Sequence, residues 1–194
     1  MEKYRYLLEK LNPQKIAEEQ RKAIIAVNEN NVCVITGGPG TGKTVLAMNL
    51  LSTLLSDEMN ACYVSKNAAP RSVFAAKLAD DNTQKVQIKN LFHGSGEFIS
   101  SESNDFDVIL VDEAHRLNEK SGLFQNLGEN QVKEIINAAK CSIFFIDKNQ
   151  RVHIKDYGSI EAIEHFAEEL GAEIEHIKLT SQFRCNGSDG YLAW

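Results

Sequence analysis

The chain has 194 residues, of which 43% are hydrophobic and 25% charged, and this ordinary globular mixture excludes wholesale disorder. Its length suits one domain, or one domain with a small appendage. With 21 basic against 27 acidic residues, the net charge of −6 is not that of a free-standing nucleic-acid clamp. A local basic contact stays open, because basic residues outnumber acidic ones between residues 66 and 89.

Neither membrane insertion nor disulfide bonding is indicated by the sequence. No apolar run approaches the length of a membrane span, and the opening letters MEKYRYLLEK lack the apolar core of a signal peptide. The four cysteines are scattered without a C-x-x-C pair, which favours small reduced core residues over a metal or disulfide framework. We therefore expect a cytoplasmic protein without a membrane partner.

Apolar patterning predicts helices and strands that alternate along the chain. Short β-branched runs bounded by turn residues indicate buried strands, and apolar residues at helical spacing indicate amphipathic helices. In chain order we expect helices at 2–11 and 14–28, a strand at 32–36, a helix at 46–55, a strand at 61–65, a helix from Pro70, a loop at 92–103, a strand at 108–111, a helix at 131–139, a strand at 141–146, a helix at 159–170 and a strand at 174–180. The strands are continuous apolar runs, which is typical of a parallel sheet covered on both faces. The predicted fold is therefore α/β, with three layers and a mostly parallel sheet.

The strongest motif is GGPGTGKT at residues 37–44, which satisfies G-x-x-x-x-G-K-[ST] between a predicted strand and a predicted helix. Glycines let backbone N–H groups turn inward around a phosphate, and the helix N-terminus adds the positive end of its dipole. Lys43 would reach the β- and γ-phosphates, and the Thr44 hydroxyl would hold Mg²⁺. A plain glycine turn is the disfavoured alternative. The expected nucleotide-binding residues of this segment are Gly37, Gly38, Pro39, Gly40, Thr41, Gly42, Lys43 and Thr44.

A second motif is FDVILVDEAH at residues 106–115, a buried strand that ends in adjacent acids. The carboxyl ends of parallel strands form the edge where α/β folds bind ligands. We therefore expect Asp112 to hold Mg²⁺, directly or through water, and Glu113 to orient the attacking water as a base. The alternative is a solvated acidic turn. His115 could couple the nucleotide state to neighbouring loops, or make a structural hydrogen bond.

Polar residues also follow the last two predicted strands. Asp147 and Gln150 leave the sheet near the expected γ-phosphate, where Gln150 could sense that phosphate or hold the water. In LTSQFR, residues 179–184, Arg184 could stabilise transition-state charge and Phe183 could stack on a base. Taken alone, a polar loop residue, a surface arginine and a core phenylalanine are the commoner interpretations.

Together these motifs resemble the first motor domain of superfamily 1 DNA/RNA helicases and, more narrowly, the Schlafen-type helicase-like P-loop proteins. GGPGTGKT resembles the Walker A loop of that superfamily, DEAH its Walker B motif, DKNQ its third motif and LTSQFR its fourth. HRLNEKSGLF and QFRCNGSDGYLAW look especially close to the Schlafen-type subgroup. The resemblance implies a RecA-like P-loop NTPase fold, with Phe183 on the adenine and Arg184 at the γ-phosphate.

The same resemblance implies further binding residues and a division of the chain. EEQRKAI would place Gln20 at the adenine edge, and VSKNAAPRSVFAAKL resembles the segment that touches single-stranded nucleic acid. The expected members of that contact are Lys66, Asn67, Pro70 and Arg71. The implied units are N-terminal helices with the adenine-reading segment at 1–30, a RecA-like ATPase domain at 31–185 and the start of a truncated continuation at 186–194. Superfamily 1 motors use two RecA-like domains, so a missing second domain is an expected partner.

The expected function is Mg²⁺-dependent binding and hydrolysis of ATP by part of a motor that acts on DNA or RNA. We expect hydrolysis by the single domain to be slow. One alternative is a nucleotide-dependent switch that moves along no strand, and another is the regulatory partner of a nuclease whose active site lies elsewhere. A kinase is disfavoured, because the paired acids and the terminal arginine suit attack by water.

Overall fold

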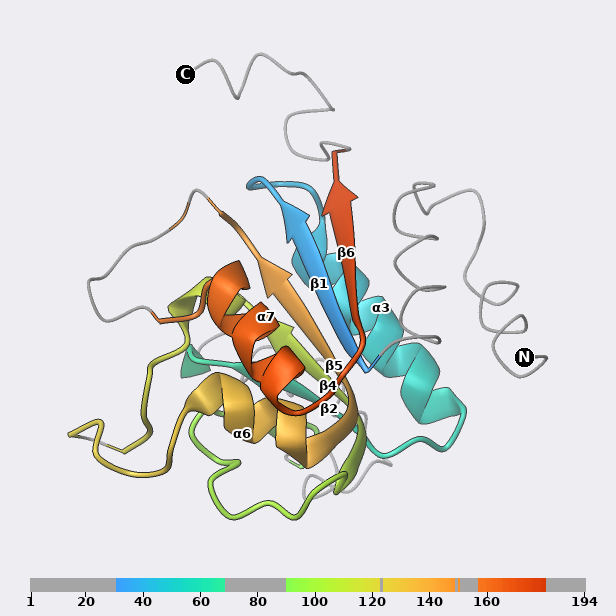
Figure 1. Ribbon diagram of the computed structural model, residues 1–194. Coiled ribbons are helices and arrows are strands. Elements are labelled where there is room, and N and C mark those ends of the chain that lie inside the picture. Colours follow the sequence, from blue (N-terminus) through green and yellow to red (C-terminus); the bar gives the residue numbers. More distant parts are fainter. Residues whose placement is uncertain (1–30, 69–89, 123, 149, 151–156, 181–194) are drawn as a thin grey trace.

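The computed structural model describes residues 31–68, 90–122, 124–148, 150 and 157–180. Its centre is a six-stranded sheet in the order β3-β2-β4-β5-β1-β6, and all pairings between these strands are parallel (Figure 1). The described strands are β1 (Val32–Gly37), β2 (Ala61–Ser65), β3 (Phe92–His93), β4 (Phe106–Asp112), β5 (Ala139–Ile146) and β6 (Ile174–Leu179). The described helices are α3 (Lys43–Ser56), α6 (Gln131–Ala138) and α7 (Ile160–Glu169), with a short 3-10 helix η1 (Ala114–Arg116).

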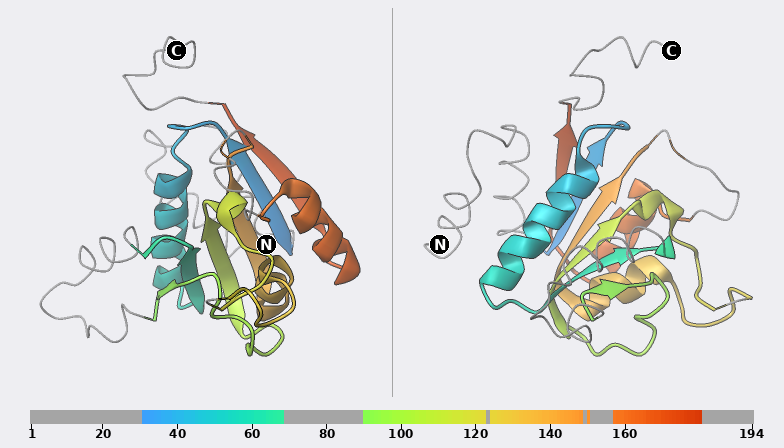
Figure 2. Two further views of the ribbon diagram at one scale, coloured as in Figure 1. Left: turned by 90° about the vertical axis from the view of Figure 1, so that its left-hand side faces the viewer. Right: turned by 180° about the vertical axis from the view of Figure 1, so that it is seen from behind.

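Helices cover the sheet on its two faces. α3 lies on one face of the sheet, and α6 and α7 lie on the other (Figure 2). α3 packs against strand residues such as Ile35 and Phe145, while α6 and α7 pack against Val34 and Phe144. Neighbouring residues of the inner strands β1, β2, β4 and β5 thus enter different cores, which is why these strands contain continuous apolar runs. The predicted three-layer α/β fold with a parallel sheet is confirmed.

The bounds of several elements differ from the predicted ones. α3 begins at Lys43 rather than at residue 46, because the glycine-rich turn leads straight into the helix. The prediction of a loop throughout 92–103 is wrong at its start, where β3 pairs with β2. A two-residue strand is too short to leave an apolar pattern, and the Phe92 ring packs edge-on against Tyr63 at a centroid distance of 5.8 Å. The helices predicted at 2–11, at 14–28 and from Pro70 lie outside the described residues.

The described cysteines Cys33, Cys62 and Cys141 are buried free thiols in the two cores. Burial raises the pKa of Cys141 to about 12, so this thiol stays protonated and packs as a small apolar group. This placement agrees with the packing role expected from the sequence. Within the described part of the chain, no helix combines the length and apolar character needed to cross a membrane.

Candidate functional site

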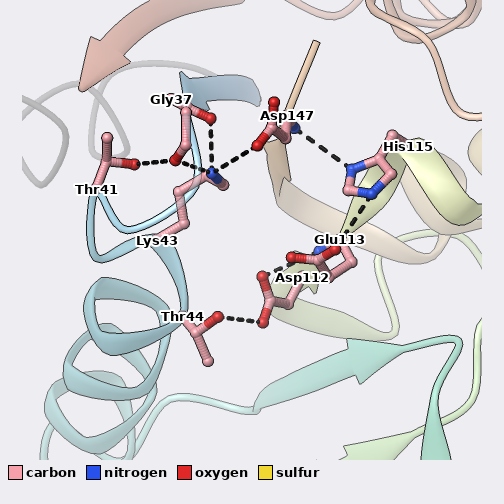
Figure 3. A network of polar contacts seen from close by, with 9 residues as sticks. Gly37, Thr41, Lys43, Thr44, Asp112, Glu113, His115 and Asp147 are labelled. Carbon is pink, nitrogen blue, oxygen red and sulfur yellow. Dashed lines mark hydrogen bonds and ion pairs between the residues drawn. The ribbon is translucent and has the colours of Figure 1, made fainter. Parts of the chain in front are cut away.

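The carboxyl ends of three neighbouring strands meet at one edge of the sheet. β5 lies between β1 and β4. Gly37 ends β1, Asp112 ends β4 and Asp147 directly follows β5. Because the three strands are parallel, these ends lie close together, and Figure 3 shows their polar groups facing one another.

The glycine loop, which we define as residues 37–44, connects β1 to α3. Gly40 and Gly42 have φ angles of 84° and 81°, in the left-handed region that favours glycine. The Thr41 side chain is 5% exposed, and its Oγ1 donates a hydrogen bond to the Gly38 carbonyl at 2.9 Å. α3 starts directly after Gly42, so the N–H groups of its first turn and its dipole face the loop. This local geometry suits an anion.

The Lys43 ammonium lies inside the curve of the glycine loop. Its Nζ donates to the carbonyl oxygens of Gly37 at 2.6 Å and Gly38 at 2.9 Å, and lies 3.8 Å from Asp147 Oδ2. The residue is 8% exposed, so its charge is held where it is only weakly screened by water. The loop therefore combines backbone donors with one fixed positive charge.

The carboxylate of Asp112 joins three parts of the molecule. Its Oδ2 accepts hydrogen bonds from Thr44 Oγ1 at 2.8 Å and from the Tyr63 hydroxyl at 2.6 Å, while Oδ1 accepts the Glu113 N–H at 3.0 Å. Burial raises the pKa of Asp112, and the hydrogen bonds from Tyr63 and Thr44 act in the opposite direction. An acidic and a hydroxyl oxygen from opposite sides of the site are thus in direct contact.

This donor set fits Mg²⁺ bound together with a nucleotide. Mg²⁺ prefers oxygen ligands and is usually held by one or two protein groups plus substrate phosphates. The Asp112 carboxylate and the Thr44 hydroxyl are such groups. No cluster of three or more His, Cys, Asp or Glu residues capable of holding a metal by itself occurs among the described residues.

Glu113 has an unusual backbone and a partly open side chain. Its φ of 54° is left-handed, which is uncommon for a residue with a side chain and marks local strain where β4 turns into η1. The side chain is 34% exposed, and its Oε2 lies 3.2 Å from His115 Nε2. The interaction with His115 lowers the pKa of Glu113 and outweighs the raising effect of burial. A charged carboxylate is therefore presented at the site.

His115 connects this carboxylate to the end of β5. It is 2% exposed, and its Nδ1 accepts a hydrogen bond from the Asp147 backbone N–H at 3.4 Å. A neutral imidazole that accepts at Nδ1 carries its proton on Nε2, which is the nitrogen that faces Glu113. Of the two roles left open by the sequence, the structural hydrogen bond is present, and it joins two residues of the site.

A cavity of about 300 Å³ lies over these groups. It is lined by the glycine loop, by the first turn of α3, and by Glu113, Asp147 and Gln150. Its volume is at the lower end for small-molecule sites. Gln150, which the sequence predicted to lie near a γ-phosphate, does line this cavity. A second cavity, of about 440 Å³, lies on the α7 side of Asp147 and His115, where Glu161 and Glu164 make it acidic.

The expected nucleic-acid residues are only partly within the described chain. Lys66 follows β2 and its Nζ donates a hydrogen bond to Asn118 Oδ1 at 2.9 Å, and both Lys66 and Asn67 are half-buried. The other residues expected to contact the adenine, the γ-phosphate or the nucleic-acid strand lie outside the described part: Gln20, Pro70, Arg71, Phe183 and Arg184.

Sequence reasoning missed Tyr63 as a member of this site. Its strand, ACYVS, reads as a uniformly buried run, and nothing in that pattern distinguishes a core tyrosine from one that reaches a carboxylate. The only signal was chemical, because a buried tyrosine hydroxyl needs a partner that a phenylalanine would not need.

The fold is similar to those of several solved helicase structures over most of the chain. Bacteroides Pif1 bound to single-stranded DNA is similar over 91% of this chain and 44% of its own, with a TM-score of 0.53 and 12% identity. Candida albicans Pif1 helicase matches over 92% of this chain and 42% of its own, with a TM-score of 0.53 and 15% identity. The Pyrococcus furiosus Hef helicase domain matches over 86% of this chain and 39% of its own, with a TM-score of 0.50 and 15% identity.

At these identities the similarity concerns the fold, which is the RecA-like P-loop NTPase fold, and the chain spans less than half of each of these proteins. No curated protein matches the sequence. The family described as "Schlafen group 3, DNA/RNA helicase domain" matches residues 30–194. This match covers most of the chain, and it agrees with the fold and with the strand ends that meet at one edge of the sheet. The protein therefore belongs to the Schlafen group 3 family of helicase-like P-loop NTPase domains.

Proposed function

We propose that this chain binds ATP with Mg²⁺ and hydrolyses it, as the first RecA-like domain of a helicase-like protein that acts on DNA or RNA. The observation that carries the proposal is that Lys43, Thr44 and Glu113 line one and the same cavity, of about 300 Å³. A phosphate-binding charge, a metal-binding hydroxyl and a general base are the parts that ATP hydrolysis requires.

Each described residue has a distinct role in this proposal. The amides of the glycine loop and the Lys43 ammonium bind the phosphates. Thr44 and Asp112, already in contact at 2.8 Å, would hold Mg²⁺, which supplies charge neutralisation at the phosphate oxygens. Glu113 orients the attacking water and accepts its proton, and Gln150 senses the γ-phosphate or holds that water.

Other parts of the proposal concern residues beyond the described ones. We propose that Phe183 stacks on the adenine, that Gln20 contacts the adenine edge, and that Arg184 stabilises the γ-phosphate. Contact with single-stranded DNA or RNA is assigned to the described residues Lys66 and Asn67 together with Pro70 and Arg71, which lie outside the described part. Support comes from the helicase description of the family and from the similarity to a Pif1 structure that contains single-stranded DNA.

The direct test of the catalytic assignment is Glu113→Gln. This change keeps the size of the side chain but removes the base, so we expect ATP affinity within about twofold of wild type and hydrolysis lowered by about a hundredfold or more. Affinity is measured by fluorescence of a labelled ATP and hydrolysis by phosphate release. Glu164→Gln, at a half-exposed glutamate of α7, is the matched control and should leave both unchanged. Hydrolysis that survives Glu113→Gln would contradict the assignment.

A further inference from the structure

Tyr63 is an entirely buried side chain whose hydroxyl ends inside the candidate metal site. It lies in the middle of β2 with 0% exposure, and its ring packs edge-on against Phe92. In the sheet it pairs with Leu110 of β4. Asp112 lies two residues beyond Leu110 and so points to the same face of β4. A tyrosine is long enough to reach it, and the two oxygens are 2.6 Å apart.

The Asp112 carboxylate is held from separate directions. Thr44 approaches from α3, Tyr63 from β2, and the Glu113 N–H from the turn after β4. Thr44 and Tyr63 both donate to the same acceptor, Asp112 Oδ2. The hydrogen bond from Tyr63 therefore fixes the orientation in which this oxygen meets the Thr44 hydroxyl. A carboxylate held by several donors loses little conformational freedom when a ligand binds to it.

We infer that Tyr63 is a positioning residue for Mg²⁺: its hydroxyl fixes the Asp112 carboxylate beside Thr44, in the arrangement that binds the metal together with the nucleotide. This inference rests on the proposed function. In this role Tyr63 acts through Asp112, to which its hydroxyl donates a hydrogen bond, and it does not line the cavity.

A purely structural role makes a different prediction. If the hydroxyl only satisfied the buried carboxylate, its removal would cost folding stability but would leave the Mg²⁺ requirement unchanged. If it positions the carboxylate, its removal must weaken Mg²⁺ binding selectively. Loss of an outer partner of a metal ligand typically costs tenfold to a hundredfold in metal affinity.

The test compares wild type with Tyr63→Phe, which retains the ring in the core. Binding of a fluorescent ATP analogue is measured in EDTA and across a Mg²⁺ titration. We expect the half-saturating Mg²⁺ concentration to rise about tenfold in Tyr63→Phe, with affinity in EDTA within about twofold of wild type. Phe92→Leu, which disturbs the same ring contact without touching the hydroxyl, is the control and should lower the melting temperature without changing the Mg²⁺ requirement.

Two results would overturn the inference: an unchanged Mg²⁺ requirement in Tyr63→Phe, or an equal loss of affinity with and without Mg²⁺. A second measurement does not depend on the stability of the Tyr63→Phe single variant. In an Asp112→Asn background the charged acceptor is gone, and adding Tyr63→Phe must cause no further change in the Mg²⁺ requirement. A further rise would also contradict the inference. If wild type bound the analogue with no response to Mg²⁺, the result would contradict the proposed function itself.

Discussion

At the scale of single residues, His115 joins the two acidic ends of the site. One ring nitrogen accepts the Asp147 N–H, and the other lies 3.2 Å from the Glu113 carboxylate (Figure 3). Since Glu113 carries strained backbone and is only partly buried, this contact restricts where its carboxylate can point. A base that must meet a bound water depends on such restriction.

We therefore predict that His115→Ala lowers turnover by about tenfold to a hundredfold while nucleotide affinity changes less than about twofold. The measurement is steady-state phosphate release, with kcat and KM determined separately. His115→Gln, whose side-chain amide can donate a hydrogen bond to Glu113, should recover part of the loss. His176→Ala serves as the control, because His176 is 44% exposed and contacts Glu164. Wild-type turnover in a folded His115→Ala protein would contradict this role.

Residue types with a defined chemistry could be predicted from the sequence, and residues that act through a partner could not. The glycine loop, Asp112, Glu113 and Gln150 stand in motifs or directly after strands, and they line or adjoin the cavity. Tyr63 sits within an apolar run, and its role arises only when β2 lies beside β4. That neighbour relation is a product of tertiary packing, and no local pattern in either strand encodes it.

At the scale of elements, α6 is fixed at its start by a side-chain cap. Asn130 Oδ1 accepts the N–H of Val132 at 2.9 Å and of Lys133 at 3.5 Å, and the residue is 4% exposed. The following residue, Gln131, holds the preceding loop through hydrogen bonds to the Asn118 N–H and to the Ser121 hydroxyl. The start of this helix therefore anchors the segment that leads away from the candidate site.

Removal of the cap should be measurable as a loss of stability. We predict that Asn130→Ala lowers the free energy of unfolding by about 1 kcal/mol, because helix N–H groups in a buried position lose their acceptor. Asn130→Asp, which keeps a capping oxygen, should cost less than half of that. Urea unfolding followed by circular dichroism provides the values, and equal stabilities for Asn130→Ala and wild type would count against the cap.

A second contact between elements places the segment just before α7 beside η1, the short helix that follows Glu113. The N–H groups of Tyr157 and Gly158 donate to the Leu117 carbonyl at 2.7 and 3.2 Å. A Cβ on Gly158 would overlap the backbone carbonyl of Ala114, in η1 directly after Glu113. Glycine is therefore required at position 158 for close approach of two backbones.

Gly158→Ala should accordingly lower the free energy of unfolding by about 2 kcal/mol or more, since the backbone must shift to relieve the overlap. Gly171→Ala is an informative comparison. Gly171 has a φ of 70° but no atom close to an added Cβ, so its cost should be about 1 kcal/mol from backbone conformation alone. Thermal or urea unfolding of both variants gives the comparison, and a Gly158→Ala protein as stable as wild type would refute the predicted overlap.

The predicted elements follow the same division between local and long-range information. The inner strands could be located from the sequence because the two helical layers bury side chains on both faces of the sheet, and α7 could be located from its one-sided apolar spacing. β3 was missed because its place depends on packing of Phe92 against Tyr63, which lies 29 residues earlier in the sequence. The strand order was likewise beyond local patterning.

At the scale of the whole molecule, the sheet brings three distant segments into one site. The glycine loop, the end of β4 and the end of β5 are far apart in sequence, yet they converge because their strands are parallel neighbours. Membership of the Schlafen group 3 helicase family and the similarity to RecA-like folds agree with this arrangement. The central proposal is therefore that this edge of the sheet binds and hydrolyses ATP.

The most direct measurement of that claim is phosphate release from ATP with Mg²⁺, with and without single-stranded DNA or RNA, by wild type and by Lys43→Ala. Lys140→Ala, at an exposed lysine paired with Asp107, controls for loss of a positive charge. We predict slow hydrolysis by wild type, which Lys140→Ala retains and Lys43→Ala loses. Acceleration by a strand would support a motor, and indifference to strands a nucleotide-dependent switch. Hydrolysis that is equal in wild type and Lys43→Ala, or absent from both, would contradict the central claim.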